Sequence, residues 1–477
     1  MVKFSIPDFP IPQGRQFDDL VQLFTGVHTS VCETGQPRLV SITLEVPHLE
    51  PLAVLESIYE PGEWHAYFEN QSEDWAVAGA EAVVLNTFSG NTRCGEARTW
   101  VQSILDNAIL AGDLDSPYAG PHAFYGMAFA AAETTESAFA PLTAWVPRWM
   151  VYRNPKTILA MANAWMEVDT DIHAQAERIW RAHHTFTQFD YTRAKPGDRL
   201  SMHRIADVSE RTRFTTSVQR ALASIHAGEF EKIVLARSEI YENPKPLAPL
   251  AALGLMRERF WGCTCFSFAS DQGVSFTGAT PECLLAVRGT ELVTHALAGS
   301  TARGKTAQED ADLGRALIES KKDRHEQELV RQAIVGRLEE LGVKTESSRT
   351  PRLLKLSNIQ HLNTRIEGTI PEEVDFFSLL EVLHPTPAVG GSPRNATVER
   401  IAEFEGIDRG LFAGAIGFVS HNGDGAGFVA IRSGLIDGHT LKLFAGAGIV
   451  EGSIPEREFD ETDLKLQAMR SIFLGDI

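Results

Sequence analysis

Two short segments that lie far apart in the chain each carry two carboxylates at a spacing of three residues. They are Asp323 with Glu326, and Glu458 with Glu461. Both segments have helical composition, and positions i and i+3 share one face of a helix. If the fold brings the two acidic faces together, a hard cation must offset their repulsion. Mg²⁺ suits this role, because it binds one or two carboxylates and keeps sites for water and an anionic substrate.

Three further residues have types and positions that suit catalysis. Lys232 begins an apolar run; such a lysine is usually a solvated strand end, and it becomes a usable base only if it is buried. Glu282 lies between a turn containing Pro281 and an apolar run, and apolar surroundings raise a carboxyl pKa enough for proton donation near neutrality. Arg432 lies inside the predicted strand Phe428–Ser433 and needs an anion there. That anion is either a substrate carboxylate or a structural ion-pair partner.

The composition sets limits on compartment and partners. The chain has 477 residues, of which 43% are hydrophobic and 22% charged, as in globular proteins with a sizeable core. A net charge of -19 argues against nucleic acid and anionic membranes as partners. The five cysteines are odd in number and lack zinc-like spacing, which fits a reducing compartment. No apolar run reaches transmembrane length and no signal peptide is visible, so we expect a cytoplasmic protein, or a stromal one after removal of a transit peptide.

The chemistry-bearing residues concentrate in the second part of the chain. We expect residues 1–207 to form the N-terminal half of a scaffold and 208–477 to form the catalytic region, within one structural unit. Asp310–Leu341 reads as one long helical region. The glycine-rich segments 298–304 and 445–450 read as turns, whose backbone amides could approach an anion. A phosphate-binding loop, a dinucleotide fingerprint and the common hydrolase motifs are all missing from the sequence.

The order and content of several motifs between residues 208 and 470 resemble the chorismate-utilising enzymes, which comprise isochorismate, salicylate, anthranilate and aminodeoxychorismate synthases. The resemblance is carried by Lys232–Arg237, Thr280–Glu282, Leu297–Ser300, Lys322–Glu326, Gln360–Leu362, His384–Ala388, Arg409–Gly414 and Gly446–Thr462. It implies an α/β (α+β) fold with two large antiparallel sheets packed face to face and helices outside.

The resemblance also implies roles for individual residues. Lys232 would activate a water molecule for attack on C2 of chorismate, and Glu282 would protonate the departing C4 hydroxyl. The implied cofactor is Mg²⁺, with the ligands Glu326 and Glu461 and the water-mediated partners Asp323 and Glu458. The implied substrate-binding residues are Ala298, Gly299, Ser300, His361, Arg432, Gly446, Gly448 and Lys465.

Single residues distinguish the branches of this family. Members that use ammonia carry a non-basic residue where this chain has Lys232, so the resemblance implies water as nucleophile and no glutaminase subunit. Aminodeoxychorismate synthases carry a lysine where this chain has Ala298, and salicylate synthases carry a hydroxyl residue near Ala388. The chain therefore resembles isochorismate synthases, with salicylate synthase and a non-catalytic relative as alternatives. One departure is Gln327, where many relatives have histidine.

The sequence also bears on the pathway that would use isochorismate. Length beyond the shared core favours a quinone pathway, menaquinone or phylloquinone, over siderophore or salicylate synthesis.

Overall fold

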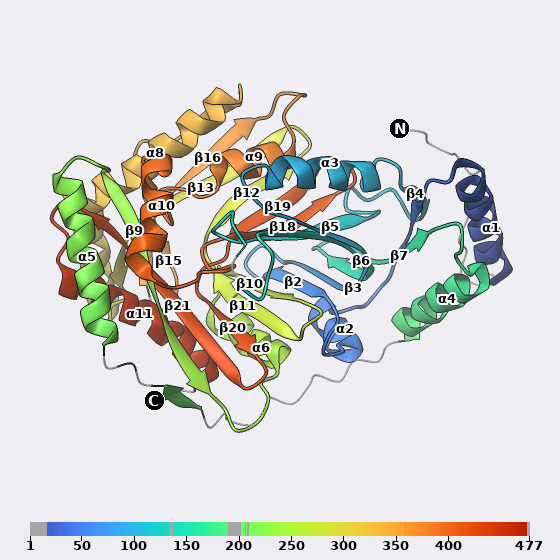
Figure 1. Ribbon diagram of the computed structural model, residues 1–477, viewed down its shortest axis with the longest axis horizontal. Coiled ribbons are helices and arrows are strands. Elements are labelled where there is room, and N and C mark those ends of the chain that lie inside the picture. The colour runs from blue at the N-terminus through green and yellow to red at the C-terminus, as the bar shows by residue number, and fades with distance from the viewer. Residues whose placement is uncertain are drawn as a thin grey trace.

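Strands occupy the centre of the molecule and helices cover its outside (Figure 1). The computed structural model describes residues 17–133, 137–188, 202–205, 207, 209–357 and 359–474, without the side chains of 184–188. Within these ranges every strand pair is antiparallel except β1 (Arg38–Glu45) with β4 (Ile109–Gly112). None of the helices in this part of the chain combines the length and apolar character needed to cross a membrane.

Hydrogen bonds join the described strands into one network with two arms, which meet at β3 (Trp75–Phe88) and β6 (Leu142–Arg153). One arm runs from β6 through β5 (His122–Met127), β18 (Ala415–Ser420), β19 (Gly425–Val429), β12 (Cys283–Arg288), β13 (Glu291–Ala302) and β16 (Ile359–Thr369). The last strand, β16, also pairs with β14 (Lys344–Ser347) and β15 (Arg352–Lys355). The other runs from β3 through β2 (His65–Asn70), β10 (Thr264–Ala269), β11 (Val274–Thr280), β20 (Ser433–Asp437), β21 (Thr440–Val450) and β9 (Lys232–Glu242), with β8 (His203–Ile205) and β17 (Gly391–Ser392) on β9. β7 (Ile158–Met166) links β6 to β1.

The two arms face each other across an aromatic core. Phe68 of β2 stacks on Phe124 of β5, with ring centroids 6.2 Å apart, and on Phe428 of β19 at 5.8 Å. The predicted α/β fold with two antiparallel sheets face to face and helices outside is therefore confirmed. One detail differs, since the sheets are continuous through β3 and β6. A bulge between Ala82 and Val84 interrupts the register of β3 with β6, and bulges bend strands sharply.

The helices lie in groups around this core (Figure 1). α1 (Phe17–Thr34) and α4 (Ile172–Gln188) cover one end, and α5 (Glu210–His226), α10 (Arg394–Glu405) and α11 (Pro455–Phe473) cover the other. The remaining helices are α2 (Pro51–Ile58), α3 (Arg93–Leu105), α6 (Pro249–Arg259), α7 (Ala307–Glu319), α8 (Lys321–Glu340) and α9 (Phe376–Leu383).

The prediction of one helical region over Asp310–Leu341 is wrong at one point. The region is divided between α7 and α8 at Ser320, which has extended dihedral angles. The Ser320 hydroxyl accepts a hydrogen bond from the backbone amide of Asp323 at 3.3 Å, and serine is a favoured residue at a helix N-cap. As a result, Asp323 lies in the first turn of a new helix, where carboxylates are stabilised by the helix dipole, and Glu326 lies in the following turn.

Three predictions of local structure near the site are also wrong. The glycine-rich segment 445–450 belongs to strand β21, where Gly446 pairs with Ala236 and Gly448 pairs with Val234 of β9. The segment that begins at Ala298 continues β13 to Ala302, with a register shift between Ala298 and Ser300. The expected strand Phe428–Ser433 is interrupted, because Arg432 takes a left-handed φ of 53° between β19 and β20. Long-range strand pairing accounts for the first two cases.

The proposed division between residues 1–207 and 208–477 stays a prediction. Backbone hydrogen bonds cross it in both arms, since β2 pairs with β10 and β5 pairs with β18.

Candidate functional site

One pocket gathers nearly all of the predicted site residues. Its walls come from β13, the first turns of α8, β21, α11 and the segment between β19 and β20. The predicted residues that line it are Glu282, Ala298, Gly299, Ser300, Asp323, Glu326, His361, Arg432, Gly446, Gly448, Glu461 and Lys465. Lys232 and Glu458 lie just behind this lining and contact residues that border it.

Lys232 is fully buried, with 0% of its surface exposed, at the first position of β9. Its Nζ atom lies 2.8 Å from Oε1 of Glu326, which forms a salt bridge. Gly448 on the neighbouring strand makes this contact possible. A Cβ atom at position 448 would lie 2.7 Å from Oε1 of Glu326 and 3.1 Å from Cε of Lys232. Any larger residue there would force the Glu326 carboxylate, and with it the salt bridge, to shift.

Glu282 lies between β11 and β12 and is 3% exposed. Burial raises the pKa of its carboxyl group to about 7, although the charge of Lys232 and a hydrogen bond with Thr386 act in the opposite direction. The backbone is held on both sides: the Glu282 amide donates to Thr280 Oγ1 at 3.1 Å, and its carbonyl accepts from the Val429 amide at 3.1 Å. The carboxyl group can therefore exchange a proton near neutral pH from a fixed position.

The four carboxylates singled out by their spacing occupy α8 and α11, as predicted. Burial raises the pKa of Asp323; the Ser320 hydroxyl opposes this effect, and the negative charges of Glu326 and Glu461 reinforce it. Burial likewise raises the pKa of Glu458, whose carboxylate lies 3.3 Å from Lys322 Nζ. The two acidic faces thus act on each other electrostatically.

Lysines form salt bridges with three of these four carboxylates, namely Glu326, Glu458 and Glu461. Lys465 Nζ donates to Glu461 Oε1 at 2.7 Å and to the Gly446 carbonyl at 2.8 Å. Burial alone would raise the pKa of Glu461, but Lys465, Lys322 and a hydrogen bond from Ser300 lower it below its usual value. The described residues contain no group of three or more histidine, cysteine or acidic side chains gathered closely enough to hold a metal ion. The donor chemistry of the facing carboxylates nevertheless fits Mg²⁺, which binds one or two carboxylates together with water and substrate oxygens.

Arg432 lines the same pocket. Its Nη2 atom lies 3.2 Å from Nε2 of His361. Burial, Arg432 and Lys465 lower the pKa of His361 well below its usual value, so the imidazole is neutral and accepts this hydrogen bond. Among the described residues the structure shows no salt bridge for Arg432. Its positive charge is therefore available to an anionic group in the pocket.

The pocket also contains residues that sequence reasoning did not single out, namely Lys322, Arg409, Phe412, Ile431 and Phe444. Lys322 and Arg409 stand inside recognised motifs, which was an available signal. Arg409 donates to the carbonyls of Val234 at 2.8 Å and Val389 at 3.0 Å, and thereby holds the wall of the pocket. Phe412 and Phe444 stack with ring centroids 5.1 Å apart and form its apolar side. Phe412 also stands in the Arg409–Gly414 motif, whereas Phe444 resembles an ordinary core residue in the sequence.

Gln327 does not enter the pocket. It is buried, and its amide nitrogen donates to Thr364 Oγ1 at 2.8 Å. The residue anchors α8 to β16 rather than contacting a ligand of the site.

Comparison with known proteins identifies the family of this chain. The family model described as chorismate binding enzyme matches residues 26–474. The chain is 32% identical to isochorismate synthase MenF of Bacillus subtilis over 456 residues, which cover 93% of this chain and 95% of that protein. It is 42% identical to the salicylate biosynthesis isochorismate synthase of Pseudomonas aeruginosa over 267 residues, which cover 56% of this chain and 55% of that protein.

Solved structures show the same fold. The menaquinone-specific isochorismate synthase MenF of Escherichia coli superposes with a TM-score of 0.75 at 24% identity, covering 94% of this chain and 99% of that one. Anthranilate synthase component I of Streptococcus pneumoniae superposes with a TM-score of 0.63 at 18% identity, covering 84% and 93%. Since the family model extends over nearly the whole chain and the family motifs converge on one pocket, this chain belongs to the chorismate binding enzymes.

Proposed function

We propose that this chain is an isochorismate synthase, which isomerises chorismate to isochorismate. The observation that carries the proposal is the pairing of Lys232 and Glu282 at one pocket. Both side chains are buried, and the charge of Lys232 acts on the pKa of Glu282. A base and an acid on one substrate are what an exchange of hydroxyl groups requires, because water is a weak nucleophile and hydroxide a poor leaving group. The names of the Bacillus and Pseudomonas relatives support the same activity.

In the proposed reaction Lys232 accepts a proton from water as its oxygen bonds to C2 of chorismate. The ring double bonds shift, the C4–oxygen bond breaks, and Glu282 donates its proton so that the C4 hydroxyl leaves as water. One water enters and one departs, so the change is an isomerisation. An ammonium group has no lone pair, so Lys232 must be neutral in the reacting state and its salt bridge with Glu326 must be broken.

The other pocket residues would bind and orient the two carboxylates of chorismate. Arg432 offers a planar fork of donors to the enolpyruvyl carboxylate. Glu326 and Glu461, with Asp323 and Glu458 through water, would hold Mg²⁺. The bound ion would supply positive charge for the ring carboxylate. Lys465 and His361 would support these groups through their contacts with Glu461 and Arg432.

Product separation tests the activity directly. We expect the chain to convert chorismate with Mg²⁺ into isochorismate, and isochorismate back into chorismate. Absence of both conversions would contradict the proposal. Appearance of salicylate and pyruvate would instead identify a salicylate synthase. The pocket position of Ala388 argues against that result, since it carries no hydroxyl group.

The requirement for Mg²⁺ has a separate test. Glu461→Gln keeps the shape of the side chain but removes its charge. We expect weaker Mg²⁺ binding in calorimetry and a loss of activity by orders of magnitude, with an unchanged circular dichroism spectrum. Full turnover of the wild-type chain in excess chelator would contradict a metal requirement.

We also propose that the product serves menaquinone synthesis. The match to the Bacillus MenF protein covers 93% of this chain, whereas the match to the vibriobactin-specific enzyme of Vibrio cholerae covers 55%. Loss of menaquinone, with siderophore production intact, is the expected result of deleting the gene.

A further inference from the structure

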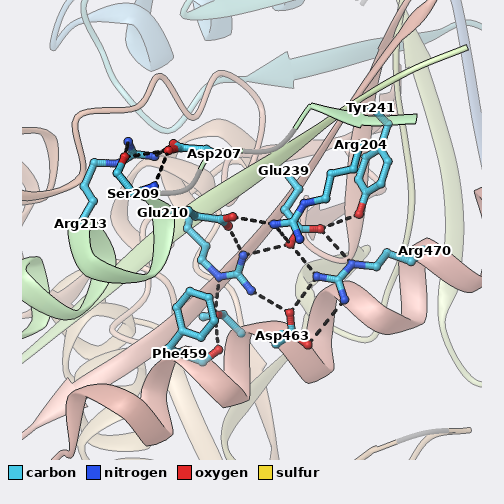
Figure 2. Close-up of polar contacts among 12 residues, drawn as sticks. Arg204, Asp207, Ser209, Glu210, Arg213, Glu239, Tyr241, Phe459, Asp463 and Arg470 are labelled. Carbon is cyan, nitrogen blue, oxygen red and sulfur yellow. Dashed lines mark hydrogen bonds and ion pairs between the residues drawn. The ribbon is translucent and has the colours of Figure 1, made fainter. Parts of the chain in front are cut away.

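A cluster of ionic residues with a buried centre lies beside the pocket, between β9 and α11 (Figure 2). It alternates arginines with carboxylates from β8, α5, β9 and α11. We call it the Arg237 network, and its members are Arg204, Glu210, Arg237, Glu239, Asp463 and Arg470. The proposed reaction uses none of these residues.

Arg237 uses every side of its guanidinium group. Nε donates to Thr462 Oγ1 at 2.7 Å, and Nη2 lies 3.2 Å from Asp463 Oδ1, so two successive residues of α11 are held. Nη1 contacts Glu210 and lies 3.2 Å from Glu239 Oε1. The guanidinium carbon also lies 4.3 Å from the ring centre of Phe459, another α11 residue. Arg237 is 4% exposed, so protein groups rather than water satisfy its charge.

Arg470 of α11 is the second arginine that joins this helix to β9. Arg470 donates to both oxygens of Glu239, at 2.6 and 2.8 Å, and its Nη2 lies 2.8 Å from Asp463. Figure 2 shows Arg470 and Asp463 on α11 turned toward Glu239. The helix is therefore attached to β9 at two points along its length.

Strand geometry connects this network to the proposed base. Successive side chains of a strand point to opposite faces. In β9, Lys232 and Val234 belong to the face that borders the pocket, and Arg237 and Glu239 belong to the other face. The strand that carries Lys232 thus holds α11 with its reverse side.

Helix geometry connects the network to the proposed metal ligands. Residues that share a helix face recur at intervals of three or four. Glu458, Glu461 and Lys465 follow this spacing on the pocket side, whereas Phe459, Asp463 and Arg470 follow it on the side of the network. Thr462 lies between the two faces and directly follows Glu461. The Arg237 network therefore contacts α11 on the face turned away from the pocket.

We propose that Arg237 is a positioning residue that sets the rotation of α11 on β9, through Thr462 and Asp463, and thereby aims Glu461 and Glu458 at the site of Lys232. The inference rests on the proposed function and deepens it. A change of one residue in helical phase rotates a side chain by more than a quarter turn, which would carry Glu461 out of the pocket. The planar fork of arginine fixes the direction of its hydrogen bonds, and a lysine cannot reproduce it.

The first test removes the hydrogen-bond acceptor that orients Arg237 and leaves every charge of the Arg237 network in place. Thr462→Val is almost isosteric at a fully buried position but lacks the acceptor for Arg237, whereas Thr462→Ser keeps it. We expect Thr462→Val to weaken Mg²⁺ binding, measured by calorimetry without chorismate, by about 10- to 100-fold, as for other residues that orient metal ligands. The Mg²⁺ concentration for half-maximal rate should rise by the same factor. KM for chorismate at saturating Mg²⁺ should not change.

Further variants separate positioning from stability. Arg237→Lys and Asp463→Asn should weaken Mg²⁺ binding in the same direction, and Thr462→Ser should restore wild-type affinity. Asp460→Asn is the matched control, because Asp460 lies on the same helix but pairs with Arg211 at 3.3 Å on the surface. We expect it to leave Mg²⁺ affinity unchanged, and an equal loss there would overturn the inference.

The outcomes distinguish this inference from the proposed function. If Thr462→Val and Asp463→Asn lower Tm in chelator but keep wild-type Mg²⁺ affinity, the network only stabilises the fold and the positioning role is overturned. A wild-type chain that neither binds Mg²⁺ nor forms isochorismate overturns the proposed function, and the inference falls with it.

Discussion

At the scale of single residues, Glu282 illustrates how burial tunes a carboxyl group for chemistry. Its pKa of about 7, compared with an ordinary 4.5, means that the folded chain binds this proton more tightly than the unfolded chain. Glu282 therefore makes the fold less stable as the pH rises from 4.5 through 7. At about 1.4 kcal/mol for each pH unit, the full effect is about 3 kcal/mol.

This leads to a prediction for Glu282→Gln, which keeps the shape of the side chain without its charge. At pH 8 the variant should unfold at a higher urea concentration than wild type, with a free energy of unfolding larger by up to about 3 kcal/mol. At pH 4 the two free energies should not differ in this way. It should also be inactive, because an amide cannot deliver a proton to the leaving hydroxyl. Equal stability of the two proteins at both pH values would show that burial does not raise the pKa of this carboxyl group.

Lys232→Ala tests the proposed base. We expect it to lose isochorismate formation by about 10²- to 10⁴-fold, the usual contribution of general acid–base catalysis. The reverse reaction should fail equally, since the same group then returns the proton. Chorismate binding, measured by calorimetry with the same variant, should persist because Arg432 remains. A variant with more than about a tenth of wild-type turnover would contradict this role.

At the scale of secondary-structure elements, the site depends on how closely β21 approaches β9 and α8. Gly448→Ala would place a methyl group 2.7 Å from Glu326 Oε1, and overpacking of this kind costs about 1–3 kcal/mol. We expect the Lys232–Glu326 pair to separate and both Tm and activity to fall.

Gly446→Ala is the comparison on the same strand. Its added methyl group would lie 3.3 Å from the nearest atom, the Leu235 carbonyl oxygen. A smaller loss of Tm and activity is expected. Equal effects of the two substitutions would show that the strand tolerates no side chain anywhere near the pocket, and that the contact with Glu326 is not decisive.

At the scale of the whole molecule, the two halves of the chain complete each other's sheets. Removing residues 1–207 would leave the edges of β10 and β18 unpaired. It would also deprive Arg257 of Glu69, a fully buried carboxylate 2.9 Å away. We expect the fragment 208–477 to aggregate and to show no cooperative thermal transition by circular dichroism, in contrast to the full chain. A fragment that melts cooperatively and binds Mg²⁺ would establish 208–477 as an independent domain.

The amino-acid sequence alone predicts which residues carry chemistry and how neighbours along one helix are arranged. Asp323 with Glu326, and Glu461 with Lys465, share helix faces because a helix sets side-chain directions within one turn. The motif order was sufficient for the family, and the family for the sheet-and-helix architecture. None of these inferences needs contacts between distant segments.

Features that depend on such contacts could be read only from the three-dimensional fold. The salt bridge of Lys232 with Glu326 and the pKa of Glu282 arise where separate strands and helices meet. Gly448 lies in a strand rather than a turn because β9 is available to pair with it. Local propensity does not predict these features, because hydrogen-bond partners, burial and the field of neighbouring charges are set by residues that are far apart in sequence.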